Sequence, residues 1–333
     1  MRLHFLQWHI THRCNLRCTH CYQGDYSQVM DEDLLWEGFD KYLRFLNKTG
    51  LMGQVNLTGG EPLLHPSFWD LSERIVRANL RLGVLTNGTM IDERCARRLA
   101  LLKPVFVQVS LDGAKANHDR IRGEGTFEQA LRGIDCLKAQ GAHVLVSFTV
   151  QKQNYRDIRE LSIICRQHNV DKLWWDRVVS DDTKTLALTT EEFREACRMA
   201  ARRRWRYRRF DGSSMVNCGR PLQFLATKRP CRYQCGAGGD LLIYLANGDM
   251  MACRRLPFVI GNFCDGELAD IISQSDKMQM LAAPYTPKGC EGCKHLSRCQ
   301  GGARCVTYAQ TGRINIKDVN CWLPGNTGRT TIS

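Results

Sequence analysis

Residues 11–22 read THRCNLRCTHCY and place Cys14, Cys18 and Cys21 in a C-x3-C-x2-C spacing that ends in an aromatic residue. Three neighbouring thiolates suit a soft metal centre. They cannot all pair with one another as disulfides, but they can hold three corners of an iron–sulfur cube and leave its fourth iron open for chemistry. The alternatives are part of a zinc site or chance spacing in a cysteine-rich chain.

The composition is that of an ordinary globular protein. A chain of 333 residues with 43% hydrophobic content can bury a core, and its length predicts about two domains. No stretch of about 18 apolar residues is free of charge, and the N-terminus lacks the apolar region of a signal peptide, so we expect a soluble, cytoplasmic protein without a membrane segment. In a reducing compartment, the 17 cysteines indicate metal or redox chemistry.

The formal net charge of +13 is most concentrated at residues 202–209, RRRWRYRR, on a helix predicted to begin near Thr189. Such a run suits an acidic peptide or nucleic acid. It is equally compatible with a solvated helix face whose two aromatic residues pack inward. Nucleic acid is the weaker interpretation, because no zinc-finger spacing or RNP-like motif accompanies the run.

Apolar strand-like runs alternate with amphipathic helical stretches in the first half of the chain. This alternation predicts a parallel sheet covered by helices. The expected closure is a partial (β/α)6 TIM-type barrel, an α/β fold whose reactive groups lie at the C-terminal ends of the strands, where the cysteine loop also falls. The predicted strands span residues 3–10, 54–57, 81–85, 105–111, 143–150 and 172–179, and the predicted helices span residues 31–48, 67–78, 92–102, 126–140 and 155–168.

Short polar motifs follow several predicted strands. Gly59-Gly60-Glu61 closes the second strand, where two glycines let a ligand approach the backbone and the glutamate adds an acceptor. Asn87 lies in the turn after the third strand, and Ser110 closes the fourth. Each motif alone is an ordinary turn. Their succession after the cysteine loop is the informative feature.

The cysteine loop and these motifs together resemble the radical S-adenosylmethionine (SAM) enzymes, and within them the subfamily that modifies peptides. In that family three cysteines hold a [4Fe-4S] cluster, and the amino and carboxylate groups of SAM chelate its open iron. The resemblance implies that the GGE motif binds the SAM amino group, that Ser110 contacts the ribose and that Arg122, or Arg120, pairs with the SAM carboxylate. The full set of implied SAM contacts is Tyr22, Gly59, Gly60, Glu61, Asn87, Ser110 and Arg122.

The chain changes character near residue 180. We predict a radical SAM barrel over residues 1–185, a basic bridging helix or linker over residues 186–215 and a cysteine-rich α+β domain over residues 216–333. Eight cysteines of this last region resemble the SPASM extension, which holds two auxiliary [4Fe-4S] clusters. The resemblance implies one cluster on Cys290, Cys293, Cys299 and Cys321, and another on Cys231, Cys235, Cys253 and Cys305.

Two positions depart from the family pattern. Ala303 stands where a ligand cysteine is expected and Cys305 comes two residues later, so the fourth ligand of that cluster is Cys305, Cys218, Cys264 or absent. Arg254 follows Cys253 where the sulfatase-maturing branch has an aspartate that serves as base, and no general base is identified here. A pair of structural zinc sites is the alternative for this region.

The resemblance implies reductive cleavage of SAM to a 5′-deoxyadenosyl radical and oxidative modification, in particular cross-linking, of a ribosomally made peptide. The implied cofactors are SAM and three [4Fe-4S] clusters, with an external reductant such as flavodoxin or ferredoxin. Only thirteen residues precede Cys14, so we expect a leader peptide to dock on the basic helix or through a separate recognition protein. The alternatives are a radical SAM enzyme for a small molecule or cofactor precursor, and a zinc-stabilised nucleic-acid-binding protein.

Overall fold

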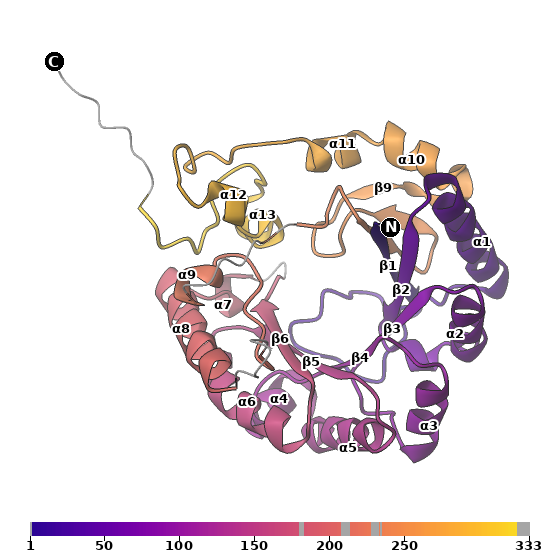
Figure 1. Cartoon of the computed structure of the whole chain (residues 1–333), viewed down its shortest axis with the longest axis horizontal. Coiled ribbons are helices and arrows are strands. Elements are labelled where there is room, and N and C mark those ends of the chain that lie inside the picture. Colours follow the sequence, from indigo (N-terminus) through magenta and orange to yellow (C-terminus); the bar gives the residue numbers. More distant parts are fainter. Residues whose placement is uncertain (1, 180–182, 208–213, 228–232, 234, 325–333) are drawn as a thin grey trace.

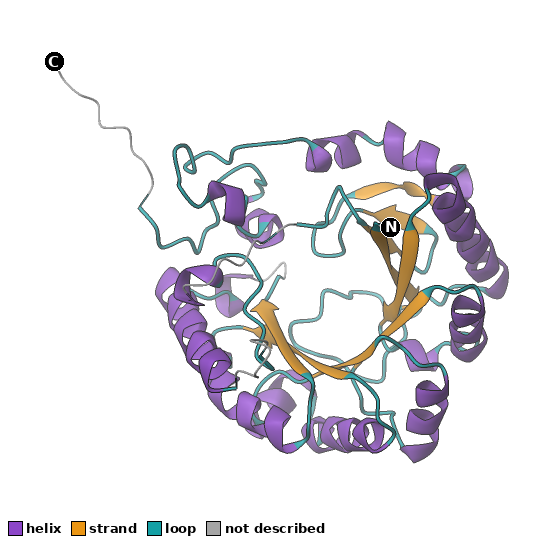
Figure 2. Cartoon of the chain, viewed as in Figure 1, coloured by secondary structure: helices purple, strands orange, loops and turns teal. Residues whose placement is uncertain are grey.

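The computed structural model describes residues 2–179, 183–207, 214–227, 233 and 235–324. Within these residues one curved sheet has the strand order β6-β5-β4-β3-β2-β1-β7-β8-β9, and helices cover its outer side (Figures 1 and 2). The strands are β1 (Leu3–Thr11), β2 (Met52–Gly59), β3 (Arg81–Thr86), β4 (Phe106–Ser110), β5 (Val144–Val150), β6 (Lys172–Arg177), β7 (Leu241–Tyr244), β8 (Asp249–Met251) and β9 (Val259–Asn262).

Helices connect the first six strands, and all five neighbouring strand pairs among them are parallel. The helices are α1 (Glu32–Thr49), α2 (Phe68–Arg77), α3 (Glu93–Leu101), α4 (Lys115–Arg122), α5 (Thr126–Ala139), α6 (Ile158–Gln167), α7 (Thr183–Leu186), α8 (Thr190–Arg206), α9 (Phe224–Thr227), α10 (Leu268–Gln274), α11 (Asp276–Ala282), α12 (Leu296–Cys299) and α13 (Arg304–Thr311). Short 3-10 turns lie at η1 (Pro62–Leu64), η2 (Tyr155–Asp157) and η3 (Phe263–Asp265). The predicted α/β partial barrel is confirmed.

Local sequence explains where these elements start and stop. Helix α1 begins because the Asp31 side chain accepts the Leu34 N–H, and it ends at Gly50, whose φ of 66° suits a residue without a Cβ. In β5 every second residue is buried, which is the period of a strand that packs one face on a core. The predicted repeats of the first half are confirmed to within a few residues at their ends, except that η2 precedes α6 and that α4 was not predicted.

The second half of the chain extends the same sheet. Strand β7 pairs parallel with β1 on the side away from β2, in a register that sets Phe5 opposite Leu241 and Trp8 opposite Tyr244. Strands β8 and β9 follow in antiparallel order. Helices α10 and α11 pack against β9, and α12 and α13 lie between the two ends of the sheet (Figure 1). The cysteine-rich region is therefore joined to the barrel by a strand ladder, and the predicted boundaries at residues 185 and 216 stay predictions.

The basic helix is α8, and its predicted start is confirmed. Thr189 caps it, accepting the Glu192 N–H, while Glu192 accepts the Thr189 N–H in return. The expectation that both aromatic residues pack inward is wrong for Trp205, whose side chain is 79% exposed, whereas the Tyr207 ring lies 5.3 Å from the Arg166 guanidinium carbon. Residues 208 and 209 lie outside the described residues. None of the described helices has the length and apolar character needed to cross a membrane.

Candidate functional site

The cysteine loop leaves the end of β1 and lies against the end of β2. The Gly60 N–H donates to the Thr11 carbonyl at 2.7 Å, and the Glu61 N–H donates to the Arg13 carbonyl at 2.8 Å. A Cβ on Gly59 would lie 2.1 Å from the Thr11 oxygen, and one on Gly60 would lie 2.3 Å from the Arg13 oxygen. The two glycines therefore permit a close backbone approach that holds the cysteine loop on the barrel rim.

Nitrogen donors surround the three thiols of the loop. Backbone N–H groups donate to the sulfurs of Cys14 and Cys21, each at 3.4 Å, and Arg122 Nη1 lies 3.7 Å from the Cys18 sulfur. Burial raises the pKa of Cys18 to about 11, with Arg122 lowering it and the neighbouring Cys21 and Cys14 raising it further. The structure thus brings the three thiols together, with donors of the kind that stabilise sulfur anions and tune clusters.

Glu61 and Asn87 connect the rim strands next to this loop. The Glu61 carboxylate is fully buried and accepts the Thr86 hydroxyl and the Asn87 N–H, each at 2.8 Å. Burial raises the pKa of Glu61 to about 7, and these donors oppose the increase. The Asn87 amide donates to Asn15 Oδ1 at 2.8 Å and lies 3.9 Å from the Cys14 sulfur. Both residues lie at the rim, as predicted, and their contacts with SAM stay predictions.

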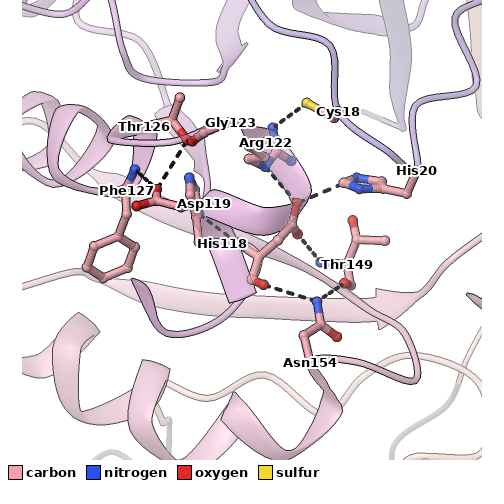
Figure 3. A network of polar contacts seen from close by, with 11 residues as sticks. Cys18, His20, His118, Asp119, Arg122, Gly123, Thr126, Phe127, Thr149 and Asn154 are labelled. Carbon is pink, nitrogen blue, oxygen red and sulfur yellow. Dashed lines mark hydrogen bonds and ion pairs between the residues drawn. The ribbon is translucent and has the colours of Figure 1, made fainter. Parts of the chain in front are cut away.

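Asp112, to which the sequence assigned no role, is a buried centre of polar contacts, and its partners Arg122, His20 and Thr149 are labelled in Figure 3. Its carboxylate accepts Arg122 Nε at 2.6 Å and the Thr149 N–H at 2.8 Å, and it lies 3.5 Å from His20 Nε2. The cysteine loop, β5 and α4 therefore meet at one anion. Arg122, the predicted partner of the SAM carboxylate, already pairs with Asp112 and contacts Cys18. Ser110, the predicted ribose contact, ends β4 opposite Ser147 in β5.

His118 supports Asp112 from α4. Its Nδ1 accepts the Asp112 N–H at 3.1 Å, while the Asn154 amide donates to the Asp112 carbonyl at 3.1 Å (Figure 3). Burial lowers the pKa of His118 to about 4, and Arg122 lowers it further. The ring is therefore neutral near pH 7 and acts as an acceptor at Nδ1.

The four cysteines predicted for one auxiliary site line a single cavity of about 250 Å³. Burial raises the pKa of Cys299 to about 12, and Asp318 and the other three thiols of the group raise it as well. Gly302 makes this turn possible, because it has a φ of 100° and a Cβ there would lie 2.3 Å from the Asp318 side chain. The cavity is lined by Cys290, Cys293, Cys299 and Cys321 together with Leu222, Phe224, Leu225, Lys294, His295 and Lys317, among other residues.

The second predicted group also assembles where it is described. Burial raises the pKa of Cys253 to about 11, and the nearby thiols of Cys305 and Cys235 contribute to the increase. Cys305, which lies two residues after the position that the family pattern predicts, is therefore close to the other cysteines of this group. Of the other candidates, Cys264 contacts Glu37 Oε2 at 3.7 Å and Cys218 is buried near Cys197. Cys231 lies outside the described residues.

An ion pair ties both cysteine groups of the second half to the barrel. Arg177, at the end of β6, donates to both carboxylate oxygens of Asp318 at 2.7 and 2.8 Å, and to Asn320 Oδ1 at 2.8 Å. Asp318 also accepts the Ala303 N–H at 2.7 Å, between Cys299 and Cys305. These contacts fix the cysteine loops relative to β6.

Several buried polar side-chain atoms at this rim have no hydrogen-bond partner among the described residues, although other atoms of some of these side chains are paired. Buried polar atoms are nearly always paired in folded proteins, so such atoms are expected where a polar ligand binds. They belong to His9 and His12 at the end of β1, to His20 and Gln23 in the cysteine loop, to Gln151 after β5 and to Arg254 after β8. This distribution suits a polar cofactor and substrate that bind against the cysteine loop.

Comparisons with known proteins find relatives over most of this chain. The mycofactocin maturase MftC of Mycobacterium tuberculosis is 28% identical over 336 residues, which cover 95% of this chain and 82% of the relative. The AdoMet-dependent heme synthase of Methanosarcina barkeri is 25% identical and covers 96% of this chain and 97% of its own. The structure of anSMEcpe with bound AdoMet and Cp18Cys peptide shares the fold, with a TM-score of 0.79 at 20% identity and coverage of 96% and 94%.

The family comparison covers most of the barrel, from within β1 to α6. Residues 8–162, which include the cysteine loop, the GGE motif, Asp112 and Arg122, match the model of the radical SAM superfamily. Over these residues the chain is similar to the radical SAM superfamily, whose members use a [4Fe-4S] cluster and SAM.

Proposed function

We propose that this protein is a peptide maturase that reductively cleaves SAM and uses the resulting 5′-deoxyadenosyl radical to oxidise, and in particular to cross-link, a ribosomally made peptide. The observation that carries the proposal is the presence of three separate cysteine groups around one barrel rim. Likeness over most of the chain to a relative named as a maturase supports it, as does a fold shared with an enzyme whose structure contains AdoMet and a peptide.

In this proposal Cys14, Cys18 and Cys21 hold the cluster that binds SAM. Gly59 and Gly60 keep the loop against β2, and Arg122 is oriented by Asp112 so that one nitrogen faces Cys18. The bound cluster supplies the electron that breaks a carbon–sulfur bond of SAM. The chain contributes position, donors to the sulfurs and a site from which water is excluded. SAM is assigned to Tyr22, Gly59, Gly60, Glu61, Asn87, Ser110 and Arg122.

We assign two further [4Fe-4S] clusters to the second half of the chain, in the manner of the SPASM extension. One is held by Cys290, Cys293, Cys299 and Cys321, and the other by Cys235, Cys253, Cys305 and the undescribed Cys231. Zinc would need its sulfurs about 2.3 Å from one point. Among the described residues, no three ligand side chains converge in a way that could hold a single metal ion. Each cysteine of a cubane binds a different iron, whereas a zinc site brings its sulfurs to one ion, so metal analysis of the reconstituted protein separates the two.

The test is an anaerobic reconstitution with iron and sulfide. We expect a brown protein with about twelve irons per chain that forms 5′-deoxyadenosine when reduced in the presence of SAM. Cys14→Ala should abolish this product while about eight irons remain. Cys264→Ala is the matched control, since Cys264 contacts Glu37 rather than a cysteine group. Absence of 5′-deoxyadenosine under a strong reductant, or a metal content dominated by zinc, would refute the proposal.

A groove between α6 and α8 is our candidate for leader-peptide docking. It has a volume of about 470 Å³ and is lined by Arg159, Arg166, Arg203 and Arg206 as well as by Ile163 and Tyr207. Its charge is complementary to an acidic leader. Arg203→Glu should weaken binding of a fluorescent acidic peptide in an anisotropy titration, and Arg97→Glu on α3 is the control. Equal binding by both variants would leave a separate recognition protein as the route.

A small molecule or cofactor precursor is the second candidate substrate, favoured by the full-length likeness to a heme synthase. Co-expression of the enzyme with a short reading frame from beside its gene separates the two. Loss of about 2 Da from the encoded peptide, measured by mass spectrometry, supports the maturase. An unmodified peptide, together with turnover of a metabolite extract, supports the second candidate.

A further inference from the structure

Arg254 lies between the N-terminal cysteine loop and the auxiliary cysteine group that contains Cys253. It follows Cys253 directly in the connection from β8 to β9, and its guanidinium carbon lies 4.3 Å above the centroid of the Tyr22 ring. Tyr22 in turn follows Cys21, and the thiols of Cys21 and Cys253 are both within electrostatic range of its hydroxyl. The arginine therefore connects the auxiliary region with the loop proposed to hold the SAM cluster.

The positive charge of Arg254 also faces the end of β1. His9 is fully buried there, and its ring centroid lies 6.5 Å from that of Tyr22. The pKa of His9 is well below its usual value, first because the ring is buried and then because Arg254 lies nearby. A neutral imidazole next to the guanidinium cannot neutralise it.

Arg254 has no anionic partner among the residues that the structure describes. Its Nε is buried without a hydrogen bond, and no described carboxylate pairs with it. The next residue is the opposite case, because Arg255 pairs with Asp176 and donates to the Arg177 carbonyl at 2.8 Å. Arg254 as a whole is only partly buried, but a buried guanidinium nitrogen without a partner is unfavourable unless a ligand completes it.

We propose that Arg254 binds a carboxylate of the substrate at the barrel rim. The inference rests on the proposed peptide substrate and names the group by which that substrate is held. The planar guanidinium fork matches a carboxylate with two parallel hydrogen bonds, and its carbon lies over the Tyr22 ring. Two sources share this chemistry in a peptide, the C-terminal carboxylate and an aspartate or glutamate side chain.

The probes are three pools of N-acetylated tripeptides passed over immobilised, reconstituted enzyme. One pool has free C-termini and no acidic side chains, the second has C-terminal amides and one glutamate, and the third replaces that glutamate with glutamine. We expect either carboxylate pool to be retained roughly 10- to 100-fold more strongly than the neutral pool. Arg254→Gln should abolish the difference, Arg254→Lys should keep part of it, and Arg97→Gln on α3 should leave it unchanged.

The outcomes separate the explanations. Preference for the first or the second pool alone supports the inference and identifies the carboxylate. Equal retention of all three pools by the unaltered enzyme overturns it, whether or not the variants fold. So does an Arg254→Gln enzyme that keeps the preference but loses iron or shows altered cluster spectra, because the arginine would then serve the clusters alone. 5′-Deoxyadenosine formation by the same preparations tests the proposed function separately.

Discussion

Replacing Arg177 with methionine should loosen the C-terminal cysteine loops without removing a cysteine. Arg177 and Asp318 are almost completely buried and are joined by two hydrogen bonds of 2.7 and 2.8 Å. Methionine would leave the Asp318 carboxylate in the interior without its cation. Removing one member of a buried ion pair costs about 3–5 kcal/mol. Because about 1.4 kcal/mol changes an equilibrium constant tenfold, the local opening equilibrium should rise roughly 140- to 3,700-fold.

Amide hydrogen exchange followed by mass spectrometry measures this opening. The reporters are the peptides containing Ala303 and Asn320, whose N–H groups donate to the Asp318 carboxylate at 2.7 and 2.9 Å. Arg77→Met is the matched control, since Arg77 is 79% exposed and pairs with Glu73 on the surface of α2, where such a pair contributes about 1 kcal/mol at most. If exchange in these peptides is equally slow in both variants, the ion pair does not hold the loops.

Three further predictions concern other parts of the molecule. The pKa of His118 is lowered to about 4, so below about pH 6.5 the unfolded chain takes up a proton that the folded chain does not. The free energy of unfolding should therefore fall by about 1.4 kcal/mol for each unit by which the pH is lowered, down to about pH 4. His118→Gln should flatten this pH dependence in urea titrations, and an unchanged slope would contradict the prediction. Gly60→Ala should displace the cysteine loop, lower the free energy of unfolding by roughly 1–3 kcal/mol and slow SAM cleavage. Gly24→Ala, with no atom within 4 Å of the new Cβ, should have none of these effects. Equal rates of SAM cleavage in the two variants would exclude the steric explanation. Cys321→Ala should remove about four irons and leave SAM cleavage intact, and iron analysis that finds no loss would show that Cys321 is not a ligand.

Local periodicity made most of the barrel predictable. The first six strands and their long helices carry alternating or helical apolar patterns, and their ends agree with the structure to within a few residues. Helix α4, with the sequence KANHDRIR, has too few apolar residues to show a helical period. Strands β7 to β9 contain three or four residues each, which is too short for a pattern to be recognised, and the pairing of β7 with β1 joins residues more than 200 positions apart.

Some residues of the candidate site were likewise predictable from the sequence, and others were not. The cysteine loop was found because its ligand spacing lies within eight residues, and the GGE motif because it closes a strand. The roles of Asp112 and His20 depend on a contact between distant segments, as does the stacking of Arg254 on Tyr22. The chain order alone contains no signal for these contacts.

The pairing of β7 with β1 has a practical consequence for anyone who wishes to shorten this protein. A version cut after residue 185 would retain every cysteine of the N-terminal loop, yet it would lose the partner along residues 5–8 of β1. The unmatched amides of that segment would form an open sheet edge, which recruits strands from other copies and promotes aggregation. Efforts to obtain a minimal catalyst should therefore trim surface loops and keep the hairpin that covers the first strand.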